Sequence, residues 1–154
     1  MDMPKPGPEH QKLQRFVGSW IGDETLAASP WGPGGPATGR SHVRVGLDGM
    51  SMLMDYEEEK DGAIVFRGHG VFGVDPMTGE ALWWWFDSMG IPPLQPSRGK
   101  WDGDTLVFVN DSERGSGRYT YRFDGRDRYH FRIENKFPGQ PEFAEFMRGD
   151  YRRA

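Results

Sequence analysis

The residue types with most scope for chemistry are a histidine and an aspartate on two neighbouring predicted strands. His69 lies in the run Ala63–Val74, and Asp87 lies in the next run, Ala81–Ser88. Pairing these runs about the turn at Asp75–Glu80 puts position 69 opposite about position 86, so a one-residue bulge would bring the two side chains together. A carboxylate beside an imidazole orients the ring and sustains its positive charge. We therefore expect a His69–Asp87 contact on the inner side of the fold.

The chain lacks the other parts of the known catalytic and metal-binding sets. No G-x-S-x-G serine elbow accompanies the His–Asp pair. The four histidines show neither H-x-H nor H-E-x-x-H spacing, and the chain has no cysteine. We therefore expect no catalytic residue and no metal site.

The segment Gly68–Gly73 reads G-x-G-x-x-G, the pattern of nucleotide-binding loops. Such a loop needs a helix that opens at the motif, so that backbone N–H groups meet the phosphates. Here the motif lies inside a predicted strand that runs into Asp75-Pro76. We interpret Gly68 and Gly70 as positions that relieve crowding or bend one face of a barrel strand.

Three consecutive tryptophans mark the candidate binding surface. Side chains alternate along a strand, so Trp83 and Trp85 share one face with Asp87, while Trp84 shares the other with Phe86. The first face predicts either core or an aromatic pocket wall, and an exposed Trp on the second face would favour a homodimer. The ligand-binding residues we expect are Trp20, Arg44, Asp55, Arg67, His69, Trp83, Trp85 and Asp87.

The elements that must position these residues are short strands that recur every 8–12 residues, each followed by a turn signal. A helix is predicted at Glu9–Phe16, and Ser29–Gly39 is predicted to be a Gly/Pro loop. Glu57-Glu58-Glu59 is predicted to be a solvated strand tip. The predicted strands are Ser19–Ala28, Arg40–Leu47, Ser51–Glu59, Ala63–Val74, Ala81–Ser88, Arg98–Trp101, Thr105–Asn110, Gly117–Phe123, Arg128–Lys136 and Glu142–Tyr151.

This order of elements predicts an all-β fold, an antiparallel up-and-down lipocalin-like barrel of about ten strands with a short N-terminal helix. A meander of consecutive hairpins favours a closed barrel, because closure removes exposed strand edges. Trp20 is expected to plug one end, and Gly18 lets the first strand bend over it. Residues 1–8 are expected to be a flexible arm, and residues 9–154 a single domain.

Four segments carry a resemblance to a known family. The segments Pro4–His10, Gly18-Ser19-Trp20, Gly68–Phe72 and Trp85–Gly90 resemble a bacterial domain family of unknown function with a lipocalin-like (calycin) barrel. The resemblance covers about residues 3–152. It implies a barrel of about ten strands, and it implies no reaction.

A more remote resemblance concerns the first strand. Leu13 and Gly18-x-Trp20-x-Gly22 are similar to the opening of the nitrobindin-like haem barrels. That resemblance implies haem held by a histidine on a late strand, where this chain offers His130 between Tyr129 and Phe131 without the expected pattern. We therefore expect no haem and no other cofactor.

Composition and charge narrow the range of partners. A net charge of −4 and a pI of about 5.6 argue against nucleic acid or an anionic membrane. The N-terminus lacks the apolar core of a signal peptide, and no run of about 18 apolar residues occurs, so we expect a cytoplasmic protein. The favoured function is binding of a small, largely apolar molecule inside the barrel. The alternatives are an enzyme that uses the same pocket for acid–base chemistry on a hydrophobic substrate, and a dimerising interaction protein without a ligand.

Overall fold

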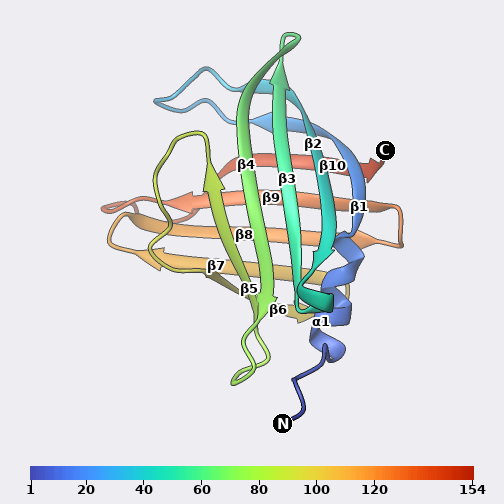
Figure 1. Ribbon diagram of the computed structural model, residues 1–154. Helices are drawn as coiled ribbons and strands as arrows, with labels where there is room; N and C mark the ends of the chain where they lie inside the picture. Colours follow the sequence, from blue (N-terminus) through green and yellow to red (C-terminus); the bar gives the residue numbers. More distant parts are fainter.

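The computed structural model describes residues 1–154 as a closed barrel of ten antiparallel strands with a short helix at one end (Figure 1). Each strand pairs with the next in the chain, and the first pairs with the last, in the order β1-β10-β9-β8-β7-β6-β5-β4-β3-β2. The strands are β1 Gly18–Leu26, β2 Gly35–Gly46, β3 Ser51–Lys60, β4 Ala63–Val74, β5 Ala81–Asp87, β6 Ser97–Asp102, β7 Thr105–Ser112, β8 Gly115–Asp124, β9 Arg128–Lys136 and β10 Ala144–Arg153. The predicted fold class is therefore confirmed.

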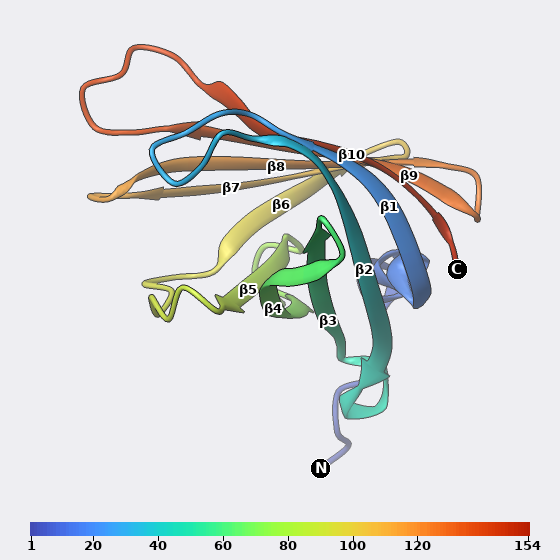
Figure 2. The same ribbon diagram turned by 90° about the horizontal axis from the view of Figure 1, so that it is seen from above.

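The barrel wall consists of two groups of strands that cross one another. Figure 1 shows β2–β5 upright in front of β7–β10, which run across them, and Figure 2 shows β1 curving from β10 round to β2. The pairing between β5 and β6 is the shortest and spans Ala81–Trp83 on β5. The wall therefore has its fewest ladder hydrogen bonds at this seam.

One predicted boundary is wrong by several residues. The loop predicted at Ser29–Gly39 ends earlier, because β2 begins at Gly35 and pairs with β1 from there onward. Glycine and proline lowered the strand signal in this stretch. The pairing with β1 decides its structure, since tertiary contacts outweigh the weak intrinsic preference for a strand.

The closed end of the barrel is filled by the N-terminal helix and the residues that follow it. Helix α1, Pro8–Leu13, continues as a single 3-10 turn, Gln14–Phe16. The ring of Phe16 stacks on Phe72 with 4.9 Å between centroids and meets Tyr121 edge-on at 4.8 Å. Leu13 and Trp20 are buried beside it, and the Trp20 indole donates a hydrogen bond to the carbonyl of Phe16 at 2.8 Å. We call these three buried side chains, Leu13, Phe16 and Trp20, the plug.

This end behaves as a packed core. The backbone of Gly18 has φ of +124°, which L residues with side chains rarely adopt, and it lets β1 begin directly after the plug. The predicted roles of Trp20 and Gly18 are confirmed. A third helical segment is the 3-10 turn Leu47–Gly49, and none of the helical segments has the length and apolar character needed to cross a membrane.

Candidate functional site: a cavity in the open half of the barrel

The half of the barrel that lies beyond the plug encloses a cavity of about 370 Å³, to which all ten strands contribute. Most of its lining is apolar or aromatic, with a smaller number of polar groups. The lining residues are Leu26, Ser41, Met54, Tyr56, Glu58, Phe66, Trp83, Trp85, Asp87, Pro93, Gln95, Ser97, Asn110, Tyr119, Tyr121, Tyr129, Phe131, Ile133, Asn135, Phe146, Met147 and Tyr151. Small-molecule sites have this size and composition.

The mouth of the cavity is bordered by loops. Trp31 from the β1–β2 loop and Phe137 from the β9–β10 loop are exposed, with 5.9 Å between their ring centroids. Two basic side chains stand at this rim, and each binds a backbone carbonyl: Lys60 donates to Gly34 at 3.1 Å and Arg114 donates to Pro92 at 3.1 Å.

The deepest part of the cavity wall is aromatic. Trp83 stacks on Phe72 with 5.8 Å between centroids, meets Tyr119 edge-on at 5.0 Å, and lies 5.4 Å from Trp85. The indole nitrogen of Trp83 is buried and has no hydrogen-bond acceptor within the protein. This nitrogen lies against Gly70 of β4 rather than at the surface of the cavity.

The glycine pattern of β4 makes room for this wall. A Cβ placed on Gly68 would lie 2.1 Å from Cζ2 of Trp85, and a Cβ on Gly70 would lie 2.8 Å from Nε1 of Trp83. Both glycines face the interior, so the interpretation of Gly68–Gly73 as a crowding-relief pattern is confirmed. The motif does not form a nucleotide-binding loop, since it lies wholly within β4.

A buried acid–tyrosine cluster forms the polar side of the cavity. The hydroxyl of Tyr56 lies 2.9 Å from each carboxylate oxygen of Glu24 and 3.1 Å from Oε2 of Glu58. The hydroxyl of Tyr151 donates to the same Glu24 carboxylate. One hydroxyl carries one hydrogen, so Tyr56 donates to one carboxylate at a time.

Glu24 is the most perturbed acid of this cluster. Burial raises the pKa of Glu24 from its ordinary value of 4.5 to about 7, and the neighbouring carboxylate of Glu58 adds to the rise. Hydrogen bonds from Tyr151 and Tyr56 act in the opposite direction by favouring the ionised form. Burial also raises the pKa of both tyrosines far above the ordinary range, so both remain neutral donors.

Three glycines on adjacent strands allow this cluster to form. A Cβ on Gly39 of β2 would lie 2.4 Å from the Tyr151 hydroxyl, and a Cβ on Gly22 of β1 would lie 2.4 Å from the Tyr151 ring. A Cβ on Gly149 of β10 would lie 2.8 Å from the same ring. Side chains at these positions would fill the space that Tyr151 and Glu24 occupy.

The third acid of the cavity, Asp87, ends β5. Its carboxylate accepts a hydrogen bond from the Trp85 indole at 2.9 Å and another from the backbone N–H of Met89 at 3.0 Å. The charge of Asp87, after burial as the larger cause, raises the pKa of Tyr119. Asp87 of β5 therefore lies near Tyr119 of β8.

Of the predicted site residues, the structure brings three together in the cavity: Trp83, Trp85 and Asp87. Trp20 belongs to the plug instead. The other four lie outside the barrel wall. Their side chains are solvent-exposed or bonded to outer neighbours, and they are Arg44, Asp55, Arg67 and His69.

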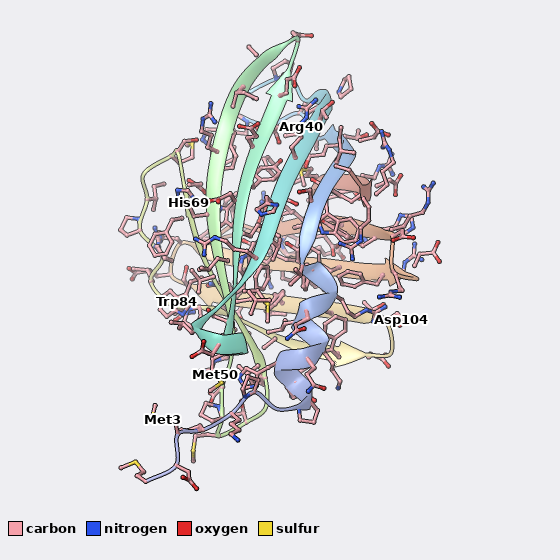
Figure 3. The ribbon with its side chains drawn as sticks, turned by 45° about the vertical axis from the view of Figure 1, so that its right-hand side comes forward. Met3, Arg40, Met50, His69, Trp84 and Asp104 are labelled. Carbon is pink, nitrogen blue, oxygen red and sulfur yellow. The ribbon has the colours of Figure 1, made fainter.

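The predicted contact between His69 and Asp87 is wrong. The predicted register is confirmed, since His69 pairs with Phe86 and Gly68 pairs with Asp87, but β4 and β5 pair without a bulge. A one-residue offset places two side chains on opposite faces of a sheet, so Asp87 points into the cavity. His69, labelled in Figure 3, points outward. His69 instead bonds to Asp55 at 2.7 Å on the outer surface.

The outward side of the tryptophan run is partly exposed. Trp84 and Phe86 retain 36% and 47% of their accessible surface, and Trp84 is labelled in Figure 3. The prediction that Trp84 and Phe86 share a face opposite Trp83 and Trp85 is confirmed.

The acid–tyrosine cluster of Glu24, Tyr56, Glu58 and Tyr151 was not predicted from the sequence. The prediction that Glu57–Glu59 is a solvated tip is wrong for Glu58, which retains 8% of its surface because β3 continues to Lys60 and its inner face remains enclosed. The sequence did contain a signal for this, because side chains alternate between the two faces of a strand. Glu58 therefore shares the inner face with Met52 and Met54. Glu24 likewise shares its face with Trp20 and Gly22.

None of the residues that line the cavity is a histidine. His130 lies on the outer face of β9 and bonds to Asp150 of β10, while His42 bonds to Ser19 at 2.9 Å. No group of three or more His, Cys, Asp or Glu side chains has the geometry of a metal site. The cavity therefore offers a bound molecule carboxylates, hydroxyls and amides rather than imidazole.

A closed antiparallel barrel with a plugged end and an interior cavity is a calycin-like fold. Residues 5–153 match the model of a protein family of unknown function, DUF1579. This chain belongs to that family. A search among curated protein sequences found no match to the chain.

Solved structures with the same fold are distant in sequence. Rv2717c from M. tuberculosis is 16% identical with a TM-score of 0.74, and the match covers 96% of this chain and 98% of that one. The S-type phycobiliprotein lyase CPES from Guillardia theta is 12% identical with a TM-score of 0.68, over 97% and 98%. A point mutant of the fluorescent protein UnaG is 15% identical with a TM-score of 0.51, over 92% and 98%.

Proposed function

We propose that this protein binds a small, largely apolar molecule in the barrel cavity. The observation that carries the proposal is the cavity itself, about 370 Å³ lined mainly by apolar and aromatic side chains in a barrel whose other end is packed solid. A protein that needed only a stable core would fill this volume, since protein interiors are close-packed. The similarity of the fold to a phycobiliprotein lyase and to a fluorescent protein supports a barrel interior that houses a molecule.

The bound molecule we propose is not haem. The residues of the cavity support this, because no histidine lines it and the late-strand candidate, His130, points outward. A haem in this cavity would lack the proximal imidazole that the resemblance to nitrobindin-like barrels implies.

Titration with a neutral apolar fluorophore, N-phenyl-1-naphthylamine, tests the proposed function. We expect saturable binding at one site with a dissociation constant in the micromolar range, which corresponds to a binding free energy of about −8 kcal/mol. Trp83→Ala should weaken binding at least tenfold, because Trp83 forms the inner cavity wall. His69→Ala should leave binding unchanged, since its side chain is 75% exposed on the outer face. Absence of any saturable signal would overturn the proposed function.

A second candidate function is assembly through the outer face of β5. The observation that favours it is the pair of partly exposed aromatic side chains, Trp84 and Phe86. Sedimentation of the wild type and of Trp84→Ala separates the two candidates. A dimer that Trp84→Ala dissociates would support assembly, and a monomer at all concentrations would exclude it.

A further inference from the structure

We propose that the molecule bound in the cavity is a cationic amine with an apolar or aromatic body. This inference rests on the proposed function, and it adds the chemical class of the ligand. Two observations carry it: the charges that line the cavity and the aromatic surfaces beside them.

The charges inside the barrel are all negative. Glu58 and Asp87 line the cavity, and Glu24 lies directly behind Tyr56. No lining residue is Lys, Arg or His, and none of these three acids takes part in a salt bridge. Buried carboxylates are usually paired with a cation. Here the protein supplies none, so a cationic ligand would complete the site.

The basic side chains nearest the mouth do not supply the missing charge. Lys60 and Arg114 are bound to backbone carbonyls at the rim, and neither lies within 4.0 Å of a carboxylate. Several acids on the outer surface have basic partners, such as Glu57 with Arg67 at 2.8 Å. The outer acids that lack a basic partner, such as Asp111 and Asp124, are exposed to water, whereas Glu24 and Glu58 are buried and Asp87 is partly buried without one.

Aromatic rings occupy the space between the acids. Tyr56 pairs with Gly68 across β3 and β4, and Gly68 pairs with Asp87 across β4 and β5, so the acid–tyrosine cluster and Asp87 lie at the same level of the wall. Gly68 has no side chain, and the rings of Tyr56 and Trp85 approach above it with 6.0 Å between centroids. Cations are attracted to the faces of such rings, most strongly to Trp. A ligand with a carboxylate is disfavoured, because its charge would face Glu58 and Asp87 in a poorly solvated space.

Three probes that differ only in their end group test the ligand class. They are 4-phenylbutylamine, 4-phenylbutanol and 4-phenylbutyrate, each used at pH 8 to displace N-phenyl-1-naphthylamine. At this pH the ammonium is charged, since such groups titrate near 10.4, and the carboxylate is ionised. We expect the amine to displace the fluorophore at a concentration at least tenfold below that of the alcohol, with the carboxylate weakest.

Two isosteric variants and a matched control locate the effect. Glu58→Gln and Asp87→Asn should each reduce the preference for the amine over the alcohol at least threefold. Glu57→Gln changes the neighbouring residue of the same strand, whose side chain lies outside the barrel, and should leave the preference unchanged. Two interior variants keep the test valid if one fails to fold.

The outcomes separate this inference from the proposed function. Binding of the fluorophore with no preference for the amine, or with the carboxylate tightest, would overturn the ligand class and leave the proposed function standing. A preference for the amine that survives both interior variants would also overturn it, because the charge would then act from elsewhere. If neither the fluorophore nor any of the three probes binds, the proposed function fails and the ligand class fails with it.

Discussion

The indole of Trp85 occupies the space in which a side chain at Gly68 would stand, since a Cβ built there lies 2.1 Å from Cζ2 of the ring. The ring cannot withdraw freely, because its Nε1 is bonded to Asp87 at 2.9 Å. Gly68 pairs with Asp87 and Trp85 pairs with Gly70, so Gly68 and Trp85 are diagonal neighbours on β4 and β5. The absence of a side chain on one strand thus sets the position of the cavity wall on the next.

We predict that Gly68→Ala destabilises the protein and disturbs the cavity. Overpacking costs about 1–3 kcal/mol, and urea unfolding should show a loss in this range. Gly73→Ala, on the same strand, is the control, because a Cβ there meets no atom within 4 Å. The prediction is contradicted if the two alanine variants have equal stability.

The plug predicts that two phenylalanines differ greatly in their contribution to the free energy of unfolding. Phe16 is fully buried and contacts rings from β4 and β8, whereas Phe86 is 47% exposed on the outer face. Removing a buried Phe side chain typically costs about 3–5 kcal/mol, so Phe16→Ala should lower the free energy of unfolding by this amount. Phe86→Ala should lower it by less than about 1 kcal/mol, consistent with an exposed site. Thermal or urea unfolding measures both.

The raised pKa of Glu24 predicts that the free energy of unfolding falls as pH rises from about 4.5 to 7. Its pKa in the folded protein is about 7, above its ordinary value of 4.5, so between these values the folded state binds a proton that the unfolded state has released. This group therefore removes roughly 3 kcal/mol from the free energy of unfolding as pH rises from about 4.5 to 7. The loss is complete above the folded pKa.

Glu24→Gln should abolish that dependence. The variant should unfold at higher urea than the wild type at pH 8, because no charge is buried, and the advantage should shrink or vanish at pH 5. Asp23→Asn is the matched control, since Asp23 is the exposed neighbour on β1 and pairs with Arg152 at the surface. A wild-type slope that persists in Glu24→Gln would show that the pH dependence arises from another group.

Binding of the amine probe should strengthen as pH rises from 6 to 8. Tyr56 and Glu58 of β3, Tyr151 of β10 and Tyr129 of β9 are the titratable groups that face Glu24, and β2 contributes only small residues there. A cation nearby favours the ionised form of Glu24, so binding releases a proton while that group is protonated.

The gain in affinity is limited by the ionised fraction of Glu24, which rises about tenfold over this interval. We expect a gain of severalfold for 4-phenylbutylamine, measured by displacement or calorimetry in buffers of different ionisation enthalpy. The neutral 4-phenylbutanol is the control and should show no such gain. Equal pH dependence of the two probes would contradict a role for Glu24.

Much of the fold is determined locally and was therefore predictable. Alternation of side chains in Ala81–Ser88 correctly placed Trp83 and Trp85 on the inner face and Trp84 on the outer one. The turn at Asp75–Glu80 correctly set the register of β4 against β5. Both features depend on neighbours in the chain, through the strand period and the turn that joins two strands.

The site itself was only partly predictable. The expected His69–Asp87 contact depended on a bulge, and a bulge is a tertiary feature that a two-strand register does not reveal. The acid–tyrosine cluster depends on closure, because β1, which carries Glu24, and β10, which carries Tyr151, become neighbours only when the barrel closes.

A meander of about ten strands with aromatic side chains on one face could be predicted from the sequence, because strand period and turn residues are features of consecutive residues. Which acids are buried and which are exposed depends on closure of the barrel. Glu57 and Glu58 are chemically alike and adjacent, yet one is bonded to Arg67 at the surface and the other lines the cavity. Closure encloses one face of the strand and leaves the other in water, and that difference in solvation gives the two carboxylates different chemistry.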